Sequence, residues 1–410
     1  MHLGYDMKIL LVNKFLYPRG GAESYMLKIG QYLTESGHQI EYFGMHDEKN
    51  TVGNHFGAYT QNMDFHTGSF KRFLYPFKII YSLEAKRKML RVLDDFKPDV
   101  VHLNNINFQL TPSIIDAAKK RNIPIVWTLH DYQLVCPNHL LYDFQKKCVC
   151  EKCVGRKKGA CIRNNCIHGS KVKSILGVIE AALYRIKGTY KKVDVFICPS
   201  NFLNAQLLKD NAKLFAEKTR VIHNFVEQKA MPAELESNYD FPYIAFAGRL
   251  SSEKGTGVLA QAARLLPDVK FVVMGSGPEE RAFEGLNNVV MTGFLTGKEL
   301  DTNIACAKAM AVPSVCFENC PLSILEAQML SVPSVTMNMG GMAELVQDHV
   351  TGVLSKSVSP EDFAAAIKDI LSDEDALEQM KLHCKEVSQN AITLGGYCDR
   401  LIQIYQSVCE

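Results

Sequence analysis

The segment "KILLVNKFLYPRGGAESYMLKIGQYLTESG", residues 8–37, spans a complete strand–loop–helix unit. Its apolar run at 8–13 predicts a buried strand, and the helical pattern that follows ends at Gly37. Gly20 and Gly21 stand between the two and predict a tight turn. A buried strand followed by a helix is the repeating unit of parallel sheets, so this segment predicts an α/β fold.

The same alternation runs through the rest of the chain. Strand-like runs at 99–103, 123–129 and 194–200 continue the first series, and "YIAFAG" at 243–248 begins a second one. The two series predict two Rossmann-like, doubly wound parallel-sheet domains. Ligands of such sheets bind at the carboxyl ends of the strands, so we expect an active site in the cleft between the domains.

A polar stretch at 226–240 separates the two series. It predicts an N-terminal domain at 1–225 and a C-terminal domain at 226–385. Residues 386–410 show only an amphipathic helical pattern.

Length and composition are those of a two-domain globular protein. The 410 residues suffice for two cores, and 47% hydrophobic with 22% charged residues is an ordinary balance. A net charge of +2 argues against a nucleic-acid partner. No apolar run approaches the roughly 18 residues of a membrane span, and the first run is too short for a signal-peptide core. We therefore expect a cytoplasmic protein.

Two glycine-containing loops follow strands of the second series. "GRLSSEKG", residues 248–255, opens a predicted helix, and Arg249 and Lys254 add positive charge where free N–H groups already attract anions. This loop predicts an anion site, although a solvated basic loop has the same composition. In "GSGPEE", residues 275–280, Gly275 is as compatible with a plain tight turn as with ligand contact.

"CFENCPLSILEAQ", residues 316–328, places a carboxylate on each side of a predicted helix start. Pro321 suits the first helical turn, which leaves Ser323 and nearby N–H groups free to face a phosphate. Glu318 lies in the preceding loop and Glu326 lies one to two turns into the helix. The two can therefore reach different parts of one ligand, although two solvated carboxylates are the alternative.

Four segments together resemble glycosyltransferase family 4, whose members are retaining enzymes of the GT-B fold. They are "GRLSSEKG", "VMGSGPEE", "FENCPLSILEAQMLSVPSV" and "GGMAELVQDHVTGVL". Residues 8–37 and "TLHDYQL" extend the resemblance to the first domain, and "HDYQLVCPN" followed by "CEKC" is similar to enzymes of cell-surface polysaccharide biosynthesis.

The resemblance implies transfer of a hexose or related sugar from a UDP- or GDP-sugar to a glycan or a polyprenyl-diphosphate-linked acceptor. The domain 1–225 would hold the acceptor, the domain 226–385 would hold the nucleotide sugar, and the helix at 386–410 would cross back onto the first domain. Where the family often has Gly-Phe, this chain has Asn319-Cys320, and Asn104 stands where a histidine is common.

The resemblance also assigns roles to single residues. Glu318 and His130 are the candidate catalytic residues, although His130 at a strand end also fits a purely structural role. Arg249 and Lys254 would hold the donor diphosphate, and Glu326 would bind the ribose hydroxyls. The other candidate contacts with the donor are Gly20, Gly21, Gly275, Phe294, Leu295, Asn319, Cys320, Leu322 and Ser323.

The expected chemistry needs no metal, because preorganised cations and N–H groups can neutralise a departing diphosphate. The D-x-D at 373–375 begins a helical pattern and reads as a helix start. Retention follows either from attack by Glu318 on the anomeric carbon or from acceptor attack on the face of the leaving group, which we favour. A nucleotide-sugar epimerase of the same fold and a non-catalytic sugar-nucleotide-binding protein are the alternatives.

A cysteine-rich, basic insertion is predicted at 136–190. Cys150 and Cys153 have the spacing of a zinc knuckle, and Cys161 and Cys166 could complete a structural zinc site of four thiolates. Cys136, Cys148 or His168 could substitute for one of them, and an iron–sulfur cluster or free thiols are the alternatives.

Positive charge is concentrated in the same region. Residues 145–192 contain 13 Lys and Arg but two Glu, so their balance is 13 − 2 = +11. The segment "SILGVIEAALYRIKGTY" mixes an apolar face with cations, which favours peripheral binding to an anionic membrane surface at the cytoplasmic face. A solvated basic face is the alternative.

Overall fold

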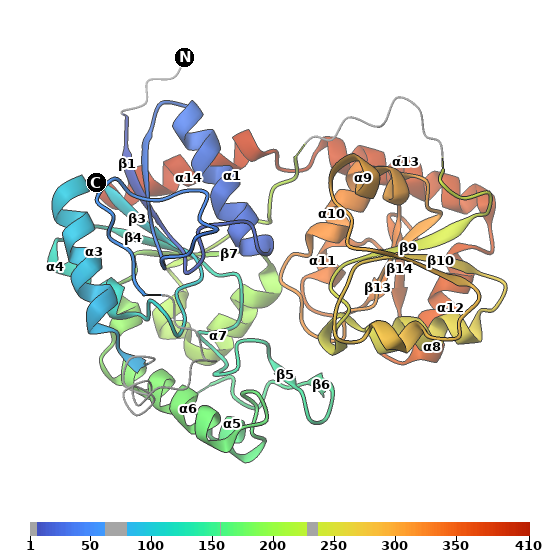
Figure 1. Ribbon diagram of the computed structural model, residues 1–410, viewed down its shortest axis with the longest axis horizontal. Coiled ribbons are helices and arrows are strands. Elements are labelled where there is room, and N and C mark those ends of the chain that lie inside the picture. The colour runs from blue at the N-terminus through green and yellow to red at the C-terminus, as the bar shows by residue number, and fades with distance from the viewer. Residues whose placement is uncertain (1–5, 62–79, 156, 228–236) are drawn as a thin grey trace.

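A computed structural model describes residues 6–61, 80–155, 157–227 and 237–410. It consists of two lobes, each built around a parallel sheet of six strands (Figure 1). The first sheet has the order β2–β1–β3–β4–β7–β8. Its strands are β1 (Lys8–Val12), β2 (Gln39–Phe43), β3 (Val100–Leu103), β4 (Ile125–Thr128), β7 (Val195–Cys198) and β8 (Thr219–Val221). The prediction of two Rossmann-like α/β lobes is therefore confirmed.

The second sheet has the order β11–β10–β9–β12–β13–β14. Its strands are β9 (Tyr243–Ala247), β10 (Lys270–Met274), β11 (Val289–Gly293), β12 (Ala309–Val312), β13 (Ser334–Met337) and β14 (Gly352–Ser355). Strand order reverses between β9 and β12 here, and between β1 and β3 in the first sheet. A crevice opens where the order of parallel strands reverses, so both lobes present their natural ligand-binding edge at these points.

Helices cover both sheets and connect successive strands. In the first lobe they are α1 (Gly21–Glu35), α3 (Leu83–Phe96), α4 (Ser113–Lys120) and α7 (Asn201–Phe215), with the 3₁₀ turn η2 (Thr189–Lys192). In the second lobe they are α8 (Thr256–Leu265), α9 (Gly297–Ala305), α10 (Leu322–Met329), α11 (Met342–Leu345), α12 (Pro360–Ile370) and α13 (Glu374–Gln389), with the 3₁₀ turns η3 (Ser252–Lys254) and η4 (Glu280–Phe283). Within the described ranges, no helix is both long and apolar enough to span a bilayer.

The last helix, α14 (Leu394–Cys409), lies against the first lobe although α13 belongs to the second (Figure 1). Its buried face carries Tyr397, Leu401 and Tyr405, which share a core with α1 and the first sheet. Tyr397 Oη lies 2.9 Å from Tyr25 Oη, and Tyr405 Oη lies 2.5 Å from His102 Nδ1. The chain therefore passes between the lobes twice.

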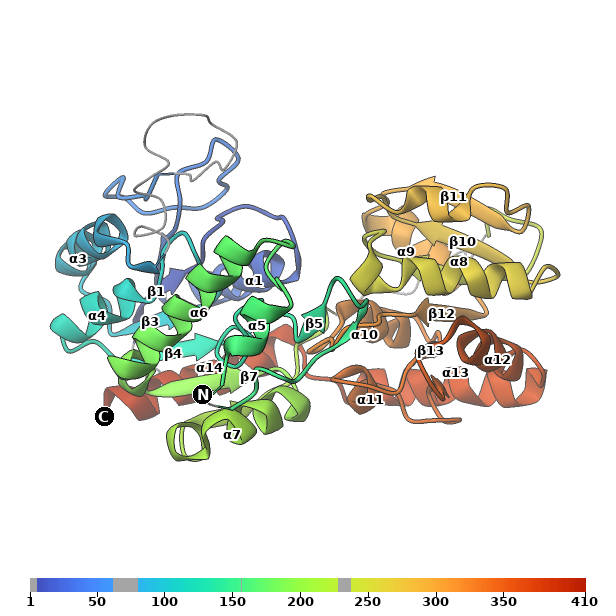
Figure 2. The same cartoon turned by 90° about the horizontal axis from the view of Figure 1, so that it is seen from below.

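The segment between β4 and β7 forms a small unit at the lower edge of the first lobe in Figure 1, a side that Figure 2 shows from below. It contains the antiparallel pair β5 (Tyr142–Asp143) and β6 (Cys148–Val149), followed by α5 (Gly159–Arg163) and α6 (Lys171–Ile186). Tyr142 is 1% exposed and packs in the core of the second lobe. The hairpin therefore bridges the two lobes.

Candidate functional site

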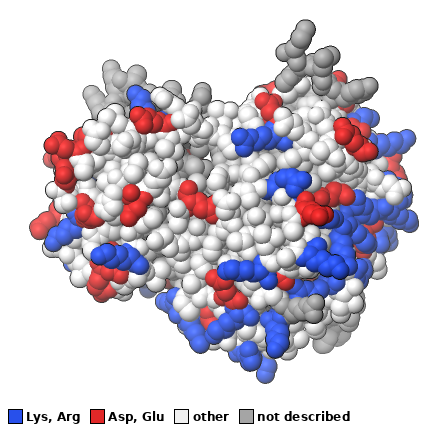
Figure 3. Space-filling model, turned by 180° about the vertical axis from the view of Figure 1, so that it is seen from behind, with Lys and Arg blue, Asp and Glu red and all other residues white. Residues whose placement is uncertain are grey.

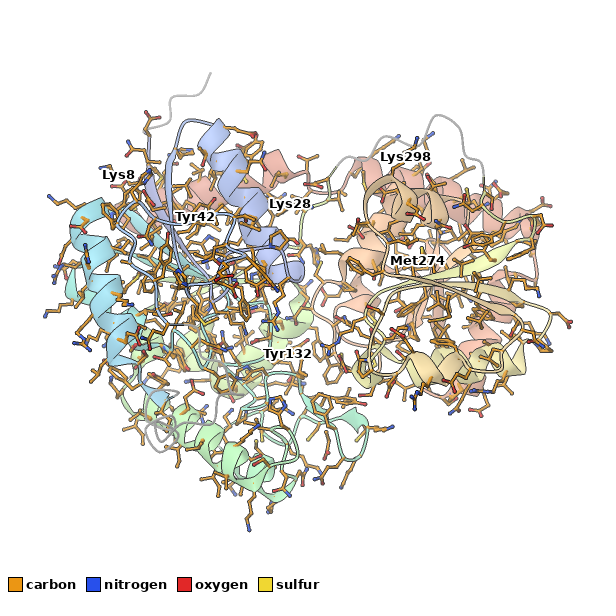
Figure 4. The ribbon with its side chains drawn as sticks, viewed as in Figure 1. Lys8, Lys28, Tyr42, Tyr132, Met274 and Lys298 are labelled. Atoms are coloured by element: carbon orange, nitrogen blue, oxygen red, sulfur yellow. The ribbon has the colours of Figure 1, made fainter. Side chains whose placement is uncertain are left out.

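A cleft of about 980 Å³ separates the two lobes and is lined by residues of both. Figure 4 shows two of them, Lys28 on α1 and Met274 at the end of β10. The structure places both candidate catalytic residues, Glu318 and His130, in this lining. It also places there Gly20, Gly21, Arg249, Lys254, Phe294, Leu295, Asn319, Cys320, Leu322, Ser323 and Glu326. Segments far apart in the sequence thus meet at one cavity.

Gly275 does not line the cleft, whereas Ser276 and Gly277 do. A Cβ atom on Gly275 would lie 1.9 Å from the carbonyl oxygen of Gly248, so a larger residue would separate the two loops. The structural reason for glycine here is close packing of the backbone, which is the alternative that the sequence left open.

Glu318 stands at the centre of a hydrogen-bonded cluster at the second lobe's edge of the cleft. Lys254 Nζ lies 2.6 Å from Glu318 Oε1, and Ser314 Oγ donates to the same oxygen at 2.8 Å. Burial disfavours the charged form of Lys254, but the neighbouring carboxylate outweighs this effect and raises its pKa. Lys254 is therefore a fixed positive charge within reach of an anion in the cleft.

Two glycines after β13 support the Glu318 loop from behind. Gly341 N donates to Glu318 O at 2.7 Å, and a Cβ on Gly341 would lie 1.7 Å from the carbonyl oxygen of Asn319. Gly340 has φ +58°, a left-handed conformation that glycine adopts without strain. These contacts hold the backbone of Glu318 and Asn319 in place at the edge of the cleft.

Helix α10 points its first turn at the cleft. It begins at Leu322, one residue later than expected, because Pro321 has an extended ψ of 120° and serves as the N-cap. The first N–H groups of a helix have no partner within it, and the helix dipole makes this end positive. Leu322 and Ser323 therefore offer donors to an anion, and Glu326 lies one turn further along the same wall.

His130 lies opposite, at the end of β4. Its Nε2 is 2.9 Å from Asn104 Oδ1, and its ring packs edge-on against Tyr25 at a centroid distance of 4.9 Å. Burial lowers the pKa of His130 to about 4, so the ring is neutral at pH 7 and Nε2 donates to Asn104. Asn319 Nδ2 donates to the His130 carbonyl oxygen at 3.0 Å and joins the two lobes here.

Several cleft residues were missed by the sequence reasoning. Arg19, Glu23 and Lys28 come from the loop and first turns of α1, and Asn224 comes from the end of the first lobe. Glu23 accepts from Asn13 Nδ2 at 3.1 Å, and Asn224 Nδ2 donates to Cys320 O at 3.1 Å. For Arg19 and Glu23, the available signal was their position beside Gly20 and Gly21 in the loop after the first predicted strand.

The cysteine cluster does not assemble as predicted. Among the described residues, no group of three or more His, Cys, Asp or Glu side chains is arranged to hold a metal ion. Instead, Cys136 Sγ donates to Asn138 Oδ1 at 3.0 Å, and Cys153 Sγ donates to the carbonyl oxygen of Lys158 at 3.5 Å. The structure therefore does not support a zinc site of Cys150, Cys153, Cys161 and Cys166.

The geometry of the cleft suits an anionic, polar ligand. Arg249, Lys254 and the first turn of α10 concentrate positive potential on one wall, and Glu318 and Glu326 supply hydrogen-bond acceptors on either side of it. Such an arrangement can hold a diphosphate between cations and amides while carboxylates grip hydroxyl groups at both ends.

Comparison with known proteins agrees with this geometry. Residues 19–229 match the family described as Glycosyltransferase Family 4, and residues 227–387 match the one described as Glycosyl transferases group 1. An α-D-kanosaminyltransferase of Streptomyces kanamyceticus is 26% identical over 44% of this chain and 50% of its own length. A GDP-mannose-dependent α-mannosyltransferase of Corynebacterium glutamicum is 33% identical over 40% of each chain. The chain thus matches half or less of the length of these two relatives.

Solved structures share the fold over nearly the whole chain. A sucrose-phosphate synthase from Thermosynechococcus elongatus superposes with a TM-score of 0.70 at 17% identity, covering 98% of both chains. The Anabaena protein HepE in complex with UDP and glucose superposes with a TM-score of 0.69 at 18% identity, covering 98% of this chain and all of that one. At this level of identity the likeness establishes the fold alone.

Proposed function

The chain belongs to glycosyltransferase family 4, and we propose that it is a retaining glycosyltransferase that transfers a hexose or related sugar from a UDP- or GDP-sugar. The observation that carries this proposal is the meeting of Lys254, Glu318 and the N-terminus of α10 in one interlobe cleft. The complexes of the fold relative HepE with UDP and with UDP-glucose support a nucleotide-sugar donor.

The donor diphosphate would lie against Arg249, Lys254 and the N–H groups of Leu322 and Ser323. Negative charge grows on this group as the glycosidic bond breaks, so these fixed charges act most strongly in the transition state. Glu326 would accept from the ribose hydroxyls. The base would lie toward Phe294 and Leu295, where the cleft wall is apolar.

Glu318 with Asn319 and Cys320 would contact the transferred sugar. We favour attack by the acceptor hydroxyl on the face of the leaving group, with a phosphate oxygen taking the proton, because Lys254 and Ser314 already occupy one carboxylate oxygen of Glu318. His130 is neutral at pH 7 and donates from Nε2 to Asn104, so its Nδ1 would accept a hydrogen bond from a sugar hydroxyl. The chain's own cations would replace a catalytic metal.

The acceptor would be a glycan or a polyprenyl-diphosphate-linked glycan, bound on the first lobe beside Gly20 and Gly21. Arg19 and Lys28 supply positive charge at that side of the cleft. A Klebsiella pneumoniae relative, described as a protein in the cps region, is 27% identical over 66% of this chain and 68% of its own length. We therefore extend the proposal to a role in cell-surface polysaccharide biosynthesis.

A donor screen followed by a transfer assay tests the proposal. We expect one UDP- or GDP-sugar to raise the melting temperature, and Glu318→Gln to retain that shift while losing turnover by about 10²-fold or more. The exposed Lys308–Glu374 pair provides a matched control, because Lys308→Ala should leave both unchanged. Conversion of the donor without an acceptor would indicate an epimerase. A donor-induced shift without any turnover in the parent would indicate a non-catalytic binding protein, and parental turnover in Glu318→Gln would contradict the role of Glu318.

A further inference from the structure

Helix α6 (Lys171–Ile186) carries an exposed apolar stripe along its whole length. Val172 is 67% exposed, Ile175 36%, Ile179 47% and Ile186 85%. Steps of three, four and seven residues place these side chains on one face of a helix. Isolated exposed apolar residues are ordinary, but four aligned on one helix form a continuous surface that is costly to leave in water.

The opposite face of α6 is firmly packed, so the stripe is held outward. Ser174, Gly177, Glu180 and Tyr184 are all buried on that face. Gly177 packs so closely that a Cβ atom there would lie 2.5 Å from Ile167 Cδ1. The helix can therefore neither rotate nor sink to bury its apolar stripe without breaking these contacts.

Cations flank the stripe at both ends. Lys171 and Lys173 lie at its beginning, and neither has an ion-pair partner within the described ranges. At the other end Lys187 and Lys192 share the single carboxylate of Asp116, so that group of three keeps a net positive charge. Figure 3 shows that Lys and Arg gather on the first lobe, whereas the second lobe carries fewer, mixed charges.

We propose that α6 docks the first lobe onto an anionic phospholipid bilayer, with the stripe of Val172, Ile175, Ile179 and Ile186 inserted between the headgroups. A helix that is apolar on one face and basic at its edges lies in the plane of such a membrane. Attraction of Lys and Arg to anionic headgroups supplies the selectivity. Figure 1 shows α6 at the lower edge of the first lobe, and Figure 2 shows this side of the molecule from below. The observations on α6 that support membrane docking do not involve the residues of the interlobe cleft.

Co-sedimentation with vesicles tests the proposal on the full chain. We expect binding to vesicles of phosphatidylcholine mixed with phosphatidylglycerol, little binding to phosphatidylcholine alone, and weakening by salt. The double variant Ile179→Glu with Ile186→Glu should bind about tenfold or more weakly, as should Lys171→Glu with Lys173→Glu. Leu382→Glu on α13, where Leu382 is 52% exposed on the other lobe, is the matched control and should bind like the parent.

A direct reporter of insertion complements these variants. The chain has a single tryptophan, the buried Trp127, so Ile179→Trp adds a second emitter whose fluorescence should shift to the blue when anionic vesicles are added. Unchanged fluorescence, or equal binding by the parent and the Ile179→Glu, Ile186→Glu variant, would refute the docking. A parent dimer in sedimentation that becomes a monomer in that variant would show instead that a second copy covers the stripe.

Discussion

At the scale of single residues, the chemistry of the cleft depends on one ion pair. Lys254 and Glu318 come from loops 64 residues apart, and each is held by its own glycine-dependent turn. Gly255 has φ +73°, and a Cβ there would lie 1.9 Å from the Pro313 carbonyl oxygen. The two loops can therefore approach closely only with glycine at this position.

Replacement of Lys254 by Met tests its role as the fixed charge of the donor site. We expect kcat/KM for the donor to fall by about 10²-fold or more, because a half-buried cation held in place by Glu318 is lost where negative charge develops. Steady-state kinetics at varied donor concentration measures the change, with Lys308→Met as the control. Parental kinetics in Lys254→Met would mean that Arg249 and α10 suffice.

Glu180 on α6 is a residue whose burial affects stability rather than catalysis. Burial raises its pKa from 4.5 to about 8. The unfolded carboxyl gives up its proton at lower pH than the folded one, so stability falls as pH rises between these two values. Each pH unit in that window costs about 1.4 kcal/mol. We expect Glu180→Gln to flatten the slope, measured by urea unfolding across this pH range; an unchanged slope would contradict the assignment.

Nearly all the predicted catalytic and donor-contacting residues line the cleft, but the sequence did not indicate their hydrogen-bond partners. Arg249, Lys254, Glu318 and Glu326 were recognisable from local patterns, because strand ends and helix starts are short-range features. Ser314, which lies four residues before Glu318 and donates to it, carried no signal of its own. Hydrogen-bond partners depend on side-chain rotamers and on the conformations of loops, and neither can be read from a local sequence pattern.

At the scale of elements, ionic contacts anchor the cysteine-rich insertion in the position that zinc was expected to fix. Asp210 on α7 is buried and accepts from Lys158 Nζ and Arg185 Nη2, both at 2.5 Å, and from Gly155 N at 2.8 Å. Lys158 Nζ also donates to the carbonyl oxygens of Val135 and Cys153. One carboxylate thus ties the loop of Gly155 and Lys158, together with α6, to α7.

Asp210→Asn should strongly destabilise the protein. The substitution leaves the buried Lys158 without its counter-charge, and breaking a buried pair typically costs about 3–5 kcal/mol. The exposed Asp94–Arg121 pair is the matched control, where Asp94→Asn should destabilise the protein far less, because water solvates both charges when the pair is broken. Urea unfolding gives both values. Similar losses in the two variants would show that Asp210 is not the anchor.

Element types were predictable because buried strands and amphipathic helices have distinct periods. The anchoring of the insertion was not, because Asp210 lies 52 residues from Lys158 and nothing near it marks a partner. The spacing of the cysteines in the sequence suggested a metal site. Whether they can bind a metal depends on how their sulfur atoms are arranged in the folded protein, which the spacing does not determine.

At the scale of the whole molecule, a second carboxylate connects the lobes away from the donor site. Glu344 of α11 accepts from the backbone N–H groups of Asn201 at 2.8 Å and Phe202 at 2.6 Å, at the first turn of α7. His223 Nε2 lies 3.1 Å from the same carboxylate. A residue of the second lobe thus satisfies the helix N-terminus of the first.

Pairing across the cleft could not be read from the sequence, because it depends on how two independent sheets face each other. The sequence indicated Glu344 only as part of the Gly340–Gly341 motif. Strand order could not be predicted from the sequence either. The reversals beside β1 and β9, which create the crevices at the sheet edges, are a property of the sheet topology and not of any local pattern.

Glu344→Ala should open the cleft. Loss of hydrogen bonds to a charged acceptor costs about 1.5–3 kcal/mol, so we expect the donor KM to rise roughly tenfold and the radius of gyration from small-angle X-ray scattering to increase.

Burial opposes the charged form of Glu344, but the hydrogen bonds from Asn201, His223 and Phe202 outweigh this effect and lower the pKa of Glu344. The contact is therefore complete above the carboxyl's ordinary value of 4.5 and is lost as pH falls through the lowered pKa, so acid should open the parent in the same way. The exposed Glu378→Ala on α13 should change neither measurement, and an unchanged radius in Glu344→Ala would show that the β5–β6 hairpin and α14 hold the lobes together without it.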